Sequence, residues 1–321
     1  MTTIRRGPGR TDPTTGMIEI PGGTFMMGSD AFYPEEQPLR RVKVDRFWID
    51  PIPVTNRQFA QFVAATGHVT FAQIAPDMAD YPGMDPALAQ PGSLVFRKTD
   101  RPVPLHDFSQ WWEFSLGADW RHPCGPDSSL EGLEDHPVVH VAYADALAYA
   151  RWAGKSLPTE AEFEFAARGG HDGREYAWGN ELMPDGQLLA NFWQGQFPHE
   201  NTLADGWERT SPVQYYPPND YGVYDMIGNV WEWTCDWYAM PQPIAKKRPS
   251  ACCTIPNPRG GRKADSFDAN TPQVKIGRRV IKGGSHLCAE SYCQRYRPAA
   301  RHPESVDTST SHIGFRCVVR G

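Results

Sequence analysis

The chain of 321 residues lacks several features that would assign it to a common functional class. It contains no apolar run of about 18 residues or more, so no membrane-spanning helix is expected. It has no excess of positive charge, because its formal net charge at pH 7 is −6, and this disfavours nucleic acid and anionic membranes as partners. The N-terminal stretch MTTIRRGPGRTDPTTG lacks the apolar core of a signal peptide. We therefore expect a flexible leader over residues 1–16 and residence in the cytoplasm.

Several motifs of common enzymes are also missing. No G-x-x-x-x-G-K-[ST] loop, no G-x-G-x-x-G opening a helix and no G-x-S-x-G nucleophile turn occurs. The seven cysteines are an odd number, which argues against a secreted disulfide framework. Five of them are expected to be inert thiols, with the role of the vicinal pair left open: Cys124, Cys235, Cys252, Cys253 and Cys317.

Glycine, proline and tryptophan are plentiful in this chain. The 29 Gly and 30 Pro residues interrupt regular structure, whereas the 11 Trp residues supply large apolar surfaces. A hydrophobic content of 40% is enough for a core. We expect a single domain over residues 17–321, with short regular elements and long connections.

The clearest local patterns lie in residues 17–67. MIEIPGGTFMMGSD (17–30) alternates around a Pro-Gly-Gly turn and predicts a hairpin, and RRVKVDRFWID (40–50) predicts a further strand. Thr55 and Gln58 have the spacing of a capping box, and Gly67 is a typical stop. A helix is therefore expected between them.

Two more helices are expected after a long irregular segment. Residues 68–135 show no clean period. ADALAYARWAG predicts a helix that ends at Gly154, and LPTEAEFEFAARGG predicts one that begins at a capping box of Thr159 and Glu162 and ends at Gly169. We expect both to be amphipathic helices packed on the core.

His136 and His140 raise the possibility of a metal site. On a helix their spacing would place both rings on one face, as in some zinc sites. Pro137 and the two valines that follow it favour a strand instead, and no carboxylate follows within ligand reach. A structural role for both histidines is therefore favoured.

Two groups of oxygen-bearing residues lie among glycines. Asn191 with Asp205, and Asp225 with Glu232, could supply the hard ligands that Ca²⁺ prefers. Ordinary Asx turns explain the same residues, and from spacing alone they are the favoured interpretation.

The stretch KGGSHLCAESYCQRYRPAARHP contains two cysteines, Cys288 and Cys293, which are five positions apart. The same segment contains Arg295, Arg297 and Arg301, and nearby cations lower the pKa of a thiol. Two thiolates are too few for a closed zinc site but suit Cu(I) or a reversible disulfide. The residues alone leave these functions in competition with two structural thiols.

Motifs throughout the chain resemble the formylglycine-generating enzyme (sulfatase-modifying factor) family. They run in order from about residue 17 to 318: IPGGTFMMGSD, DRFWIDPIPVTNRQFAQFV, HPVVHVAYADALAYARWAGKSLPTEAEFEFAARGG, ANFWQGQFP, GNVWEW and GGSHLCAESYCQRYRPAAR…GFRC. The resemblance implies an α+β, C-type-lectin-like single-domain fold with little regular secondary structure. It covers nearly the whole chain.

The superfamily also holds non-catalytic members, so the cysteine pair is what separates the branches. The catalytic, copper-dependent branch has two cysteines five apart after GGS, which here are Cys288 and Cys293. The iron-dependent sulfoxide synthases instead have H-x-x-x-H-x-E, and HPVVHVA has Ala142 where that glutamate is needed. The resemblance therefore implies a bacterial-type oxidase, with a lectin-fold binding module or regulator as the alternative and a thiol–disulfide enzyme as a third possibility.

The reaction implied by the resemblance converts the cysteine of a C-x-P-x-R motif in an unfolded sulfatase into Cα-formylglycine with O₂. Cys288 and Cys293 are expected to hold Cu(I), and the substrate thiolate to join them. Ser285 and Tyr292 are expected to hydrogen-bond in the pocket, and Trp231 to form its wall. The protein is expected to act as a monomer.

The resemblance also implies structural calcium and an absence of the family's disulfides. Three of the four positions that match the disulfide cysteines of animal members are Ala150, Ala167 and Pro298, so neither bridge can form. The calcium positions carry over as two sets: Asn191, Phe192, Asp205 and Trp207 for the first, and Asp225, Gly228, Val230 and Glu232 for the second. Phe192, Trp207, Gly228 and Val230 are expected to contribute backbone carbonyls only. This implication reverses the preference for plain Asx turns.

Overall fold

The computed structural model of the chain describes residues 12–240 and 254–321. Residues 1–11 of the expected leader and the pair Cys252–Cys253 lie outside the described residues. Residues 12–16 form a turn in which the Thr15 N–H donates to the carbonyl of Asp12 at 3.0 Å. No helix in the described ranges is long and apolar enough to cross a membrane.

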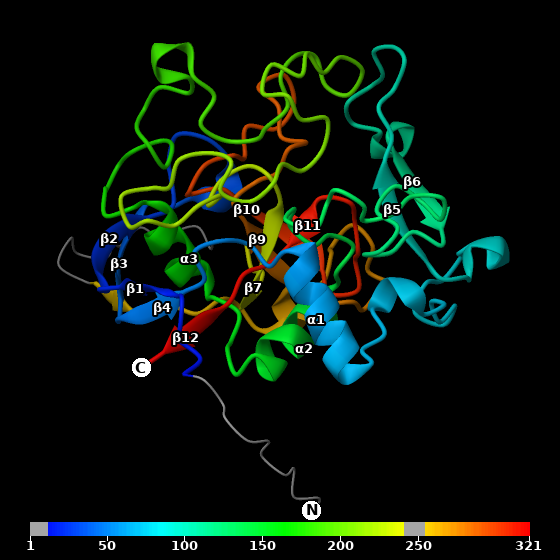
Figure 1. Cartoon of the computed structure of the whole chain (residues 1–321), viewed down its shortest axis with the longest axis horizontal. Helices are drawn as coiled ribbons and strands as arrows, with labels where there is room; N and C mark the ends of the chain where they lie inside the picture. The colour runs from blue at the N-terminus through cyan, green and yellow to red at the C-terminus, as the bar shows by residue number, and fades with distance from the viewer. Residues whose placement is uncertain (1–11, 241–253) are drawn as a thin grey trace, which may run out of the picture.

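A four-stranded sheet lies at the centre of the molecule (Figure 1). Its strands, in the order β10-β9-β7-β11, are Arg301–Ser305, Arg278–Lys282, Trp231–Trp237 and Ile313–Gly314. β9 runs antiparallel to both β10 and β7, and β11 is parallel to β7. Because β9 and β10 are adjacent and antiparallel, the connection between them begins and ends at the same end of the two strands.

The N-terminal strands pair differently from the predicted hairpin over residues 17–30. β1 (Ile18–Ile20) pairs with β4 (Phe47–Ile49), and β2 (Gly23–Met27) pairs with β3 (Arg40–Val44). The prediction of a hairpin over residues 17–30 was therefore wrong. Gly22 has a φ of +72° and packs against the backbone of residues 44–46, and β1 and β2 continue past one another along β4 and β3 instead of pairing with each other. The pairs β1–β4 and β2–β3 thus follow one another as an interrupted two-stranded antiparallel ribbon, and the loop of residues 28–39 connects its two chains at the end of β2.

Shorter strands complete the sheets. β12 (Val318–Arg320) adds to β4, and β8 (Ile255–Pro256) adds to β3. A separate hairpin of β5 (Gly92–Phe96) and β6 (Trp112–Leu116) stands apart at the right of Figure 1. It lies in the stretch that was expected to be irregular. The described 3₁₀ turns are Pro34–Glu36, Phe71–Gln73, Pro86–Leu88, Phe108–Gln110, Pro184–Gly186 and Lys263–Asp265, called η1 to η6 in chain order.

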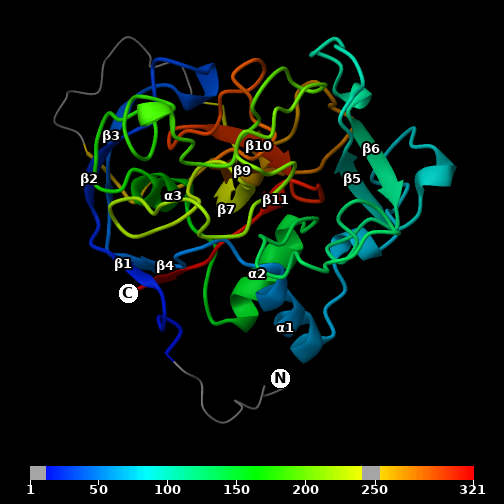
Figure 2. The same cartoon turned by 45° about the horizontal axis from the view of Figure 1, so that its top comes forward.

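The three predicted helices are confirmed. They are α1 (Asn56–Thr66), α2 (Tyr143–Trp152) and α3 (Glu160–Ala167), and α1 begins at a capping box of Thr55 and ends at left-handed Gly67. α1 and α2 lie side by side at one edge of the molecule (Figure 2). α3 is not amphipathic as predicted, since all eight of its residues are buried. It contacts β2, β3, β7 and β9, which belong to two different sheets, and no residue of α3 is exposed.

Candidate functional site

The connection between β9 and β10 contains the two predicted site cysteines. It begins with Gly283 and Gly284, both at positive φ. A Cβ atom on Gly284 would lie 2.5 Å from the carbonyl oxygen of Arg295, so a larger residue cannot occupy this position without displacing the backbone. The double glycine therefore lets the returning half of the connection pack against its start.

Cys288 and Cys293 are brought together by this folded connection. Their Sγ atoms lie 3.5 Å apart, which is far longer than the disulfide bond length of about 2.05 Å, and both are free thiols. Backbone hydrogen bonds fix both residues: the Cys288 N–H donates to Ser285 O at 2.9 Å and the Cys293 N–H to Ala289 O at 2.7 Å. Cys288 is only 2% exposed, whereas Cys293 is partly accessible.

The two thiols differ in their electrostatics. The hydrogen bond from Cys288 and the nearby Arg295 guanidinium lower the pKa of Cys293 to about 6, against the opposing effect of burial. Burial, together with the adjacent Cys293, raises the pKa of Cys288 well above its usual range. The prediction that nearby cations lower the pKa of both thiols is therefore wrong for Cys288. Cys288 is buried, and the cost of burying its thiolate outweighs the effect of the Arg295 charge.

Only one of the three predicted arginines acts on the thiols. Arg295 Nη1 donates to Cys293 Sγ at 3.5 Å. Arg297 is fully buried against the Glu36 carboxylate, and Arg301 pairs with Glu160. The expectation that all three cations crowd the thiols is corrected accordingly, since two of them neutralise buried carboxylates.

Ser285 and Tyr292 flank the thiols in different ways. The Ser285 N–H donates to Cys288 Sγ at 3.4 Å, and the Ser285 hydroxyl accepts from the Leu287 N–H at 3.2 Å. Tyr292 is 40% exposed, and its ring stacks on Phe197 at a centroid distance of 4.6 Å. Burial and the neighbouring Cys293 raise the pKa of Tyr292. Ser285 is thus a buried partner of one sulfur, and Tyr292 lies at the open side of the site.

Trp231 is the first residue of β7. Its side chain is 4% exposed and belongs to the buried cluster that contains Cys288 and against which Cys293 packs. Its ring centroid lies 5.9 Å from that of His302. The structure therefore brings the distant tryptophan into the same cluster as the thiols.

The thiol pair has the donor set of a soft metal. It offers two sulfur atoms, and among residues 12–240 and 254–321 no cluster of three or more His, Cys, Asp or Glu side chains is placed to hold a metal ion. A closed zinc site needs four ligands, whereas Cu(I) is selected by few, soft sulfur ligands. The residues present therefore fit Cu(I).

The first predicted calcium set converges on one side-chain amide. The Gln194 amide nitrogen contacts the carbonyl oxygen of Phe192 and lies 3.1 Å from Asp205 Oδ2. The Gln194 amide oxygen accepts from the Asp205 N–H at 3.4 Å, so the amide spans both groups. The carbonyl and carboxylate oxygens that the amide nitrogen contacts are hard ligands of the kind that Ca²⁺ takes. The Trp207 N–H also donates to Asp205 Oδ1 at 3.0 Å, which is an Asx turn. Asn191 is buried nearby and donates to the carbonyl of Arg209. Two members of this set, Phe192 and Asp205, therefore bring oxygen atoms together of the kind a hard cation needs.

Two members of the second predicted set, Asp225 and Glu232, bind the guanidinium of Arg316. Arg316 donates to both oxygens of Glu232, at 2.7 and 2.8 Å, and to the carbonyl of Asp225 at 3.0 Å. Burial raises the pKa of both carboxyls. Gly228 and Val230 lie between them in the chain and are buried. This set fits Ca²⁺ less well, because a guanidinium occupies the Glu232 carboxylate.

His136 and His140 do not form a metal site. Both ring nitrogens of His140 are engaged, Nδ1 with Ser93 Oγ at 2.6 Å and Nε2 with Pro123 O at 2.9 Å. The predicted strand is wrong, since Pro137 makes only an isolated bridge to Thr55 and His140 has a φ of +58°. The buried ring of His140 therefore joins β5, through Ser93, to the segment that contains Pro123.

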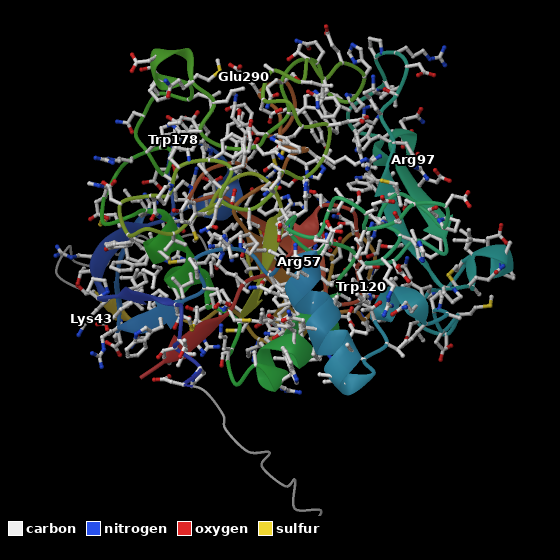
Figure 3. All side chains as sticks on the ribbon, in the orientation of Figure 1. Lys43, Arg57, Arg97, Trp120, Trp178 and Glu290 are labelled. Atoms are coloured by element: carbon white, nitrogen blue, oxygen red, sulfur yellow. The ribbon has the colours of Figure 1, made fainter. Side chains whose placement is uncertain are left out.

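The thiol segment lies at the loop-rich end of the molecule. Glu290, between the two cysteines, is labelled near the top of Figure 3, far from Arg57 on α1. Tyr33 and Glu35 were not predicted as site residues, and they reach this segment from the loop between β2 and β3. A tyrosine and a glutamate in an N-terminal loop have no spacing that links them to residues about 260 positions away in the chain.

The fold and the site together define a single-domain α+β protein with a C-type-lectin-like scaffold and a two-thiol centre in a loop. Comparison with known proteins is more specific. The family described as "Sulfatase-modifying factor enzyme 1-like domain" matches residues 6–321. A formylglycine-generating enzyme of Mycobacterium tuberculosis is 52% identical over 304 residues, covering 95% of this chain and 97% of the relative.

Two further comparisons bear on fold and activity. The structure of PvdO from Pseudomonas aeruginosa has a TM-score of 0.63 at 22% identity and covers 95% of this chain and 94% of that one, which shows the fold alone. A Bos taurus protein named inactive C-alpha-formylglycine-generating enzyme 2 is 36% identical and covers 95% of this chain and 88% of its own. The chain belongs to the formylglycine-generating enzyme (sulfatase-modifying factor) family, and it is an enzyme.

Proposed function

We propose that this enzyme oxidises the cysteine of a C-x-P-x-R motif in an unfolded sulfatase to Cα-formylglycine, with O₂ as the oxidant. In the balanced reaction, R–CH₂–SH, O₂, two electrons and two protons give R–CHO, H₂S and H₂O. The substrate carbon loses two electrons and an external thiol supplies the other two. The observation that carries this proposal is the pair of free sulfurs, 3.5 Å apart, at Cys288 and Cys293.

We propose that Cys288 and Cys293 hold Cu(I). When bound there, Cu(I) would supply a soft, redox-active centre that accepts thiolates. Cys293 is the thiol that ionises more readily, and the Arg295 guanidinium balances its charge. Cys288 is buried, so its sulfur is kept out of water. The partial exposure of Cys293 and the exposed Tyr292 mark the side from which a polypeptide substrate enters.

The neighbouring side chains shape this site. Ser285 fixes the Cys288 sulfur through its backbone N–H, and its buried hydroxyl, which accepts from the Leu287 N–H, is expected to donate a hydrogen bond in the pocket. Trp231 supplies an apolar wall that excludes water. The Tyr292 hydroxyl stays protonated at neutral pH because its pKa is raised, so it can donate a hydrogen bond or a proton.

A peptide assay tests the proposed function. A Cys-x-Pro-x-Arg peptide is incubated with the copper-loaded enzyme, O₂ and a thiol reductant, and mass spectrometry follows the conversion of the thiol to the aldehyde. Wild type should convert the peptide, and Cys288→Ser and Cys293→Ser should abolish turnover. Cys235→Ser is the matched control, because Cys235 is a free thiol in the C-terminal half of β7 and is not one of the proposed copper ligands.

The outcome separates the alternatives. No conversion by the copper-loaded wild type, or full activity in either site variant, contradicts the proposal. A binding module would leave the peptide unmodified and take up no copper. A thiol–disulfide enzyme would turn over a disulfide substrate without copper or O₂.

We further propose that Ca²⁺ binds at the first oxygen set, around Phe192 and Asp205. The convergence of the Phe192 carbonyl and the Asp205 carboxylate on the Gln194 amide supports this site. Calcium at the second set remains a prediction. We also propose a monomer that works in the cytoplasm, which is consistent with free thiols at all five cysteines of the described ranges.

A further inference from the structure

The loop of residues 29–38, here called the clamp loop, joins β2 to β3 and packs against the thiol segment. Its base is fixed tightly: a Cβ on Gly28 would lie 2.4 Å from the Glu36 carbonyl oxygen, and the Ser29 N–H donates to that oxygen at 3.3 Å. The Gly28 N–H donates to the buried Glu164 carboxylate at 2.8 Å. The clamp loop is therefore a rigidly anchored element.

Three contacts join the clamp loop to residues just after Cys293. The Tyr33 hydroxyl accepts from the Gln294 N–H at 3.0 Å. The Arg295 guanidinium lies 3.9 Å from the centroid of the Tyr33 ring, and its Nη2 donates to Glu35 Oε1 at 2.6 Å. The other terminal nitrogen of the same guanidinium, Nη1, donates to Cys293 Sγ at 3.5 Å. The Tyr33 ring thus covers one face of the Arg295 guanidinium and Glu35 binds one of its terminal nitrogens, while the other terminal nitrogen contacts the Cys293 sulfur.

The two acidic residues of the clamp loop have different environments. The Glu36–Arg297 pair is fully buried, with side-chain exposures of 0% and 1%, so loss of either partner would leave an uncompensated buried charge. The Glu35–Arg295 pair is 14% and 19% exposed and borders the thiol site. A requirement of folding explains the first pair. Folding alone does not explain why Arg295, the cation of the second pair, also donates to the Cys293 sulfur.

We propose that Glu35 and Tyr33 are positioning residues that hold Arg295 against Cys293 so that the site retains copper. This inference rests on the proposed function, because two thiolates around Cu(I) carry a net negative charge that a fixed guanidinium offsets. A freely rotating arginine would spend most of its time hydrated, and its hydrogen bond to sulfur would be lost. Glu35 acts through geometry: its own negative charge opposes that of the site, so its contribution must come from orienting Arg295.

This sign difference makes a sharp test possible. Glu35→Gln keeps an oxygen that accepts from Arg295 but removes the charge, whereas Glu35→Ala removes both. Positioning predicts that Glu35→Ala weakens Cu(I) binding about tenfold, and that Glu35→Gln stays within about threefold of wild type. A purely coulombic role predicts tighter Cu(I) binding in both variants.

The experiment measures Cu(I) affinity by competition with a chromophoric Cu(I) chelator under anaerobic conditions. Glu19→Ala is the matched control, because Glu19 pairs with Arg46 at the surface at 3.7 Å, on β1. Arg295→Met should weaken Cu(I) binding at least as much as Glu35→Ala, and urea unfolding confirms that each variant is folded. Unchanged or tighter binding in Glu35→Ala would overturn the inference and leave the proposed function intact. Failure of wild type itself to bind Cu(I) would overturn the proposed function.

Discussion

Replacing Glu164 with glutamine tests how the two halves of the site are held together. The Glu164 carboxylate, 1% exposed, accepts from Lys282 Nζ at 3.0 Å, from Arg168 Nη2 at 2.7 Å and from the Gly28 N–H at 2.8 Å. Lys282 directly precedes the double glycine of the thiol segment, and Gly28 is the base of the clamp loop. Glu164 therefore joins both segments to α3.

The magnitude follows from the charges. Burial alone would raise the pKa of Glu164, but Lys282 and Arg168 outweigh it and lower the pKa from 4.5 to about 2. Because one pKa unit corresponds to about 1.4 kcal/mol, the ionised carboxylate contributes on the order of 3 kcal/mol at neutral pH. Breaking a buried pair by removing one partner costs about 3–5 kcal/mol, which agrees. We expect Glu164→Gln to lower the free energy of unfolding by about 3–5 kcal/mol at pH 7.

The pH dependence gives the decisive readout. The folded-state pKa lies below the unfolded one, so the stabilisation is complete above about pH 5 and is lost as the pH falls toward 2. Urea unfolding at pH 7 and pH 3 should show that the difference in unfolding free energy between wild type and Glu164→Gln is about 2 kcal/mol smaller at pH 3 than at pH 7. The exposed control Glu113→Gln should change stability by less than about 1 kcal/mol at either pH. An equal loss at both values, or a loss below about 1 kcal/mol at pH 7, would refute the reasoning.

Gly284→Ala should lower the free energy of unfolding by about 2 kcal/mol, because φ is +75° and the added Cβ meets the Arg295 carbonyl; a urea titration with wild-type stability would contradict this. Ca²⁺ should raise the melting temperature of wild type but not of Asp205→Asn, and calorimetry showing equal rises would remove the first oxygen set as the site. Thr55→Ala should cost about 1 kcal/mol through the lost cap on α1, as measured by chemical unfolding, and no change would mean that the cap is not limiting.

Local signals explain what could be predicted from the sequence. The capping boxes at Thr55 and Thr159 and the left-handed stop at Gly67 involve residues a few positions apart, so the pattern contains the whole interaction. The proximity of Cys288 and Cys293 is local in the same sense, since one folded connection holds both. Resemblance to a known family added Trp231, which no spacing would have linked to the thiols.

The failures share a different cause. The alternation around Pro21-Gly22 indicates strands but not their partners, and pairing with residues 40–50 replaced the expected hairpin. The composition of α3 cannot show that sheets cover both of its faces. The raised pKa of Cys288 depends on its depth, which the nearby arginines in the sequence do not reveal.

The most direct test of the central claim is the copper stoichiometry of wild type against Cys288→Ala, measured on anaerobically loaded protein after removal of excess metal. We predict one Cu(I) per chain in wild type and close to none in Cys288→Ala, because the single sulfur that remains at the site cannot retain the ion. Equal copper in both proteins, or none in wild type, would contradict it.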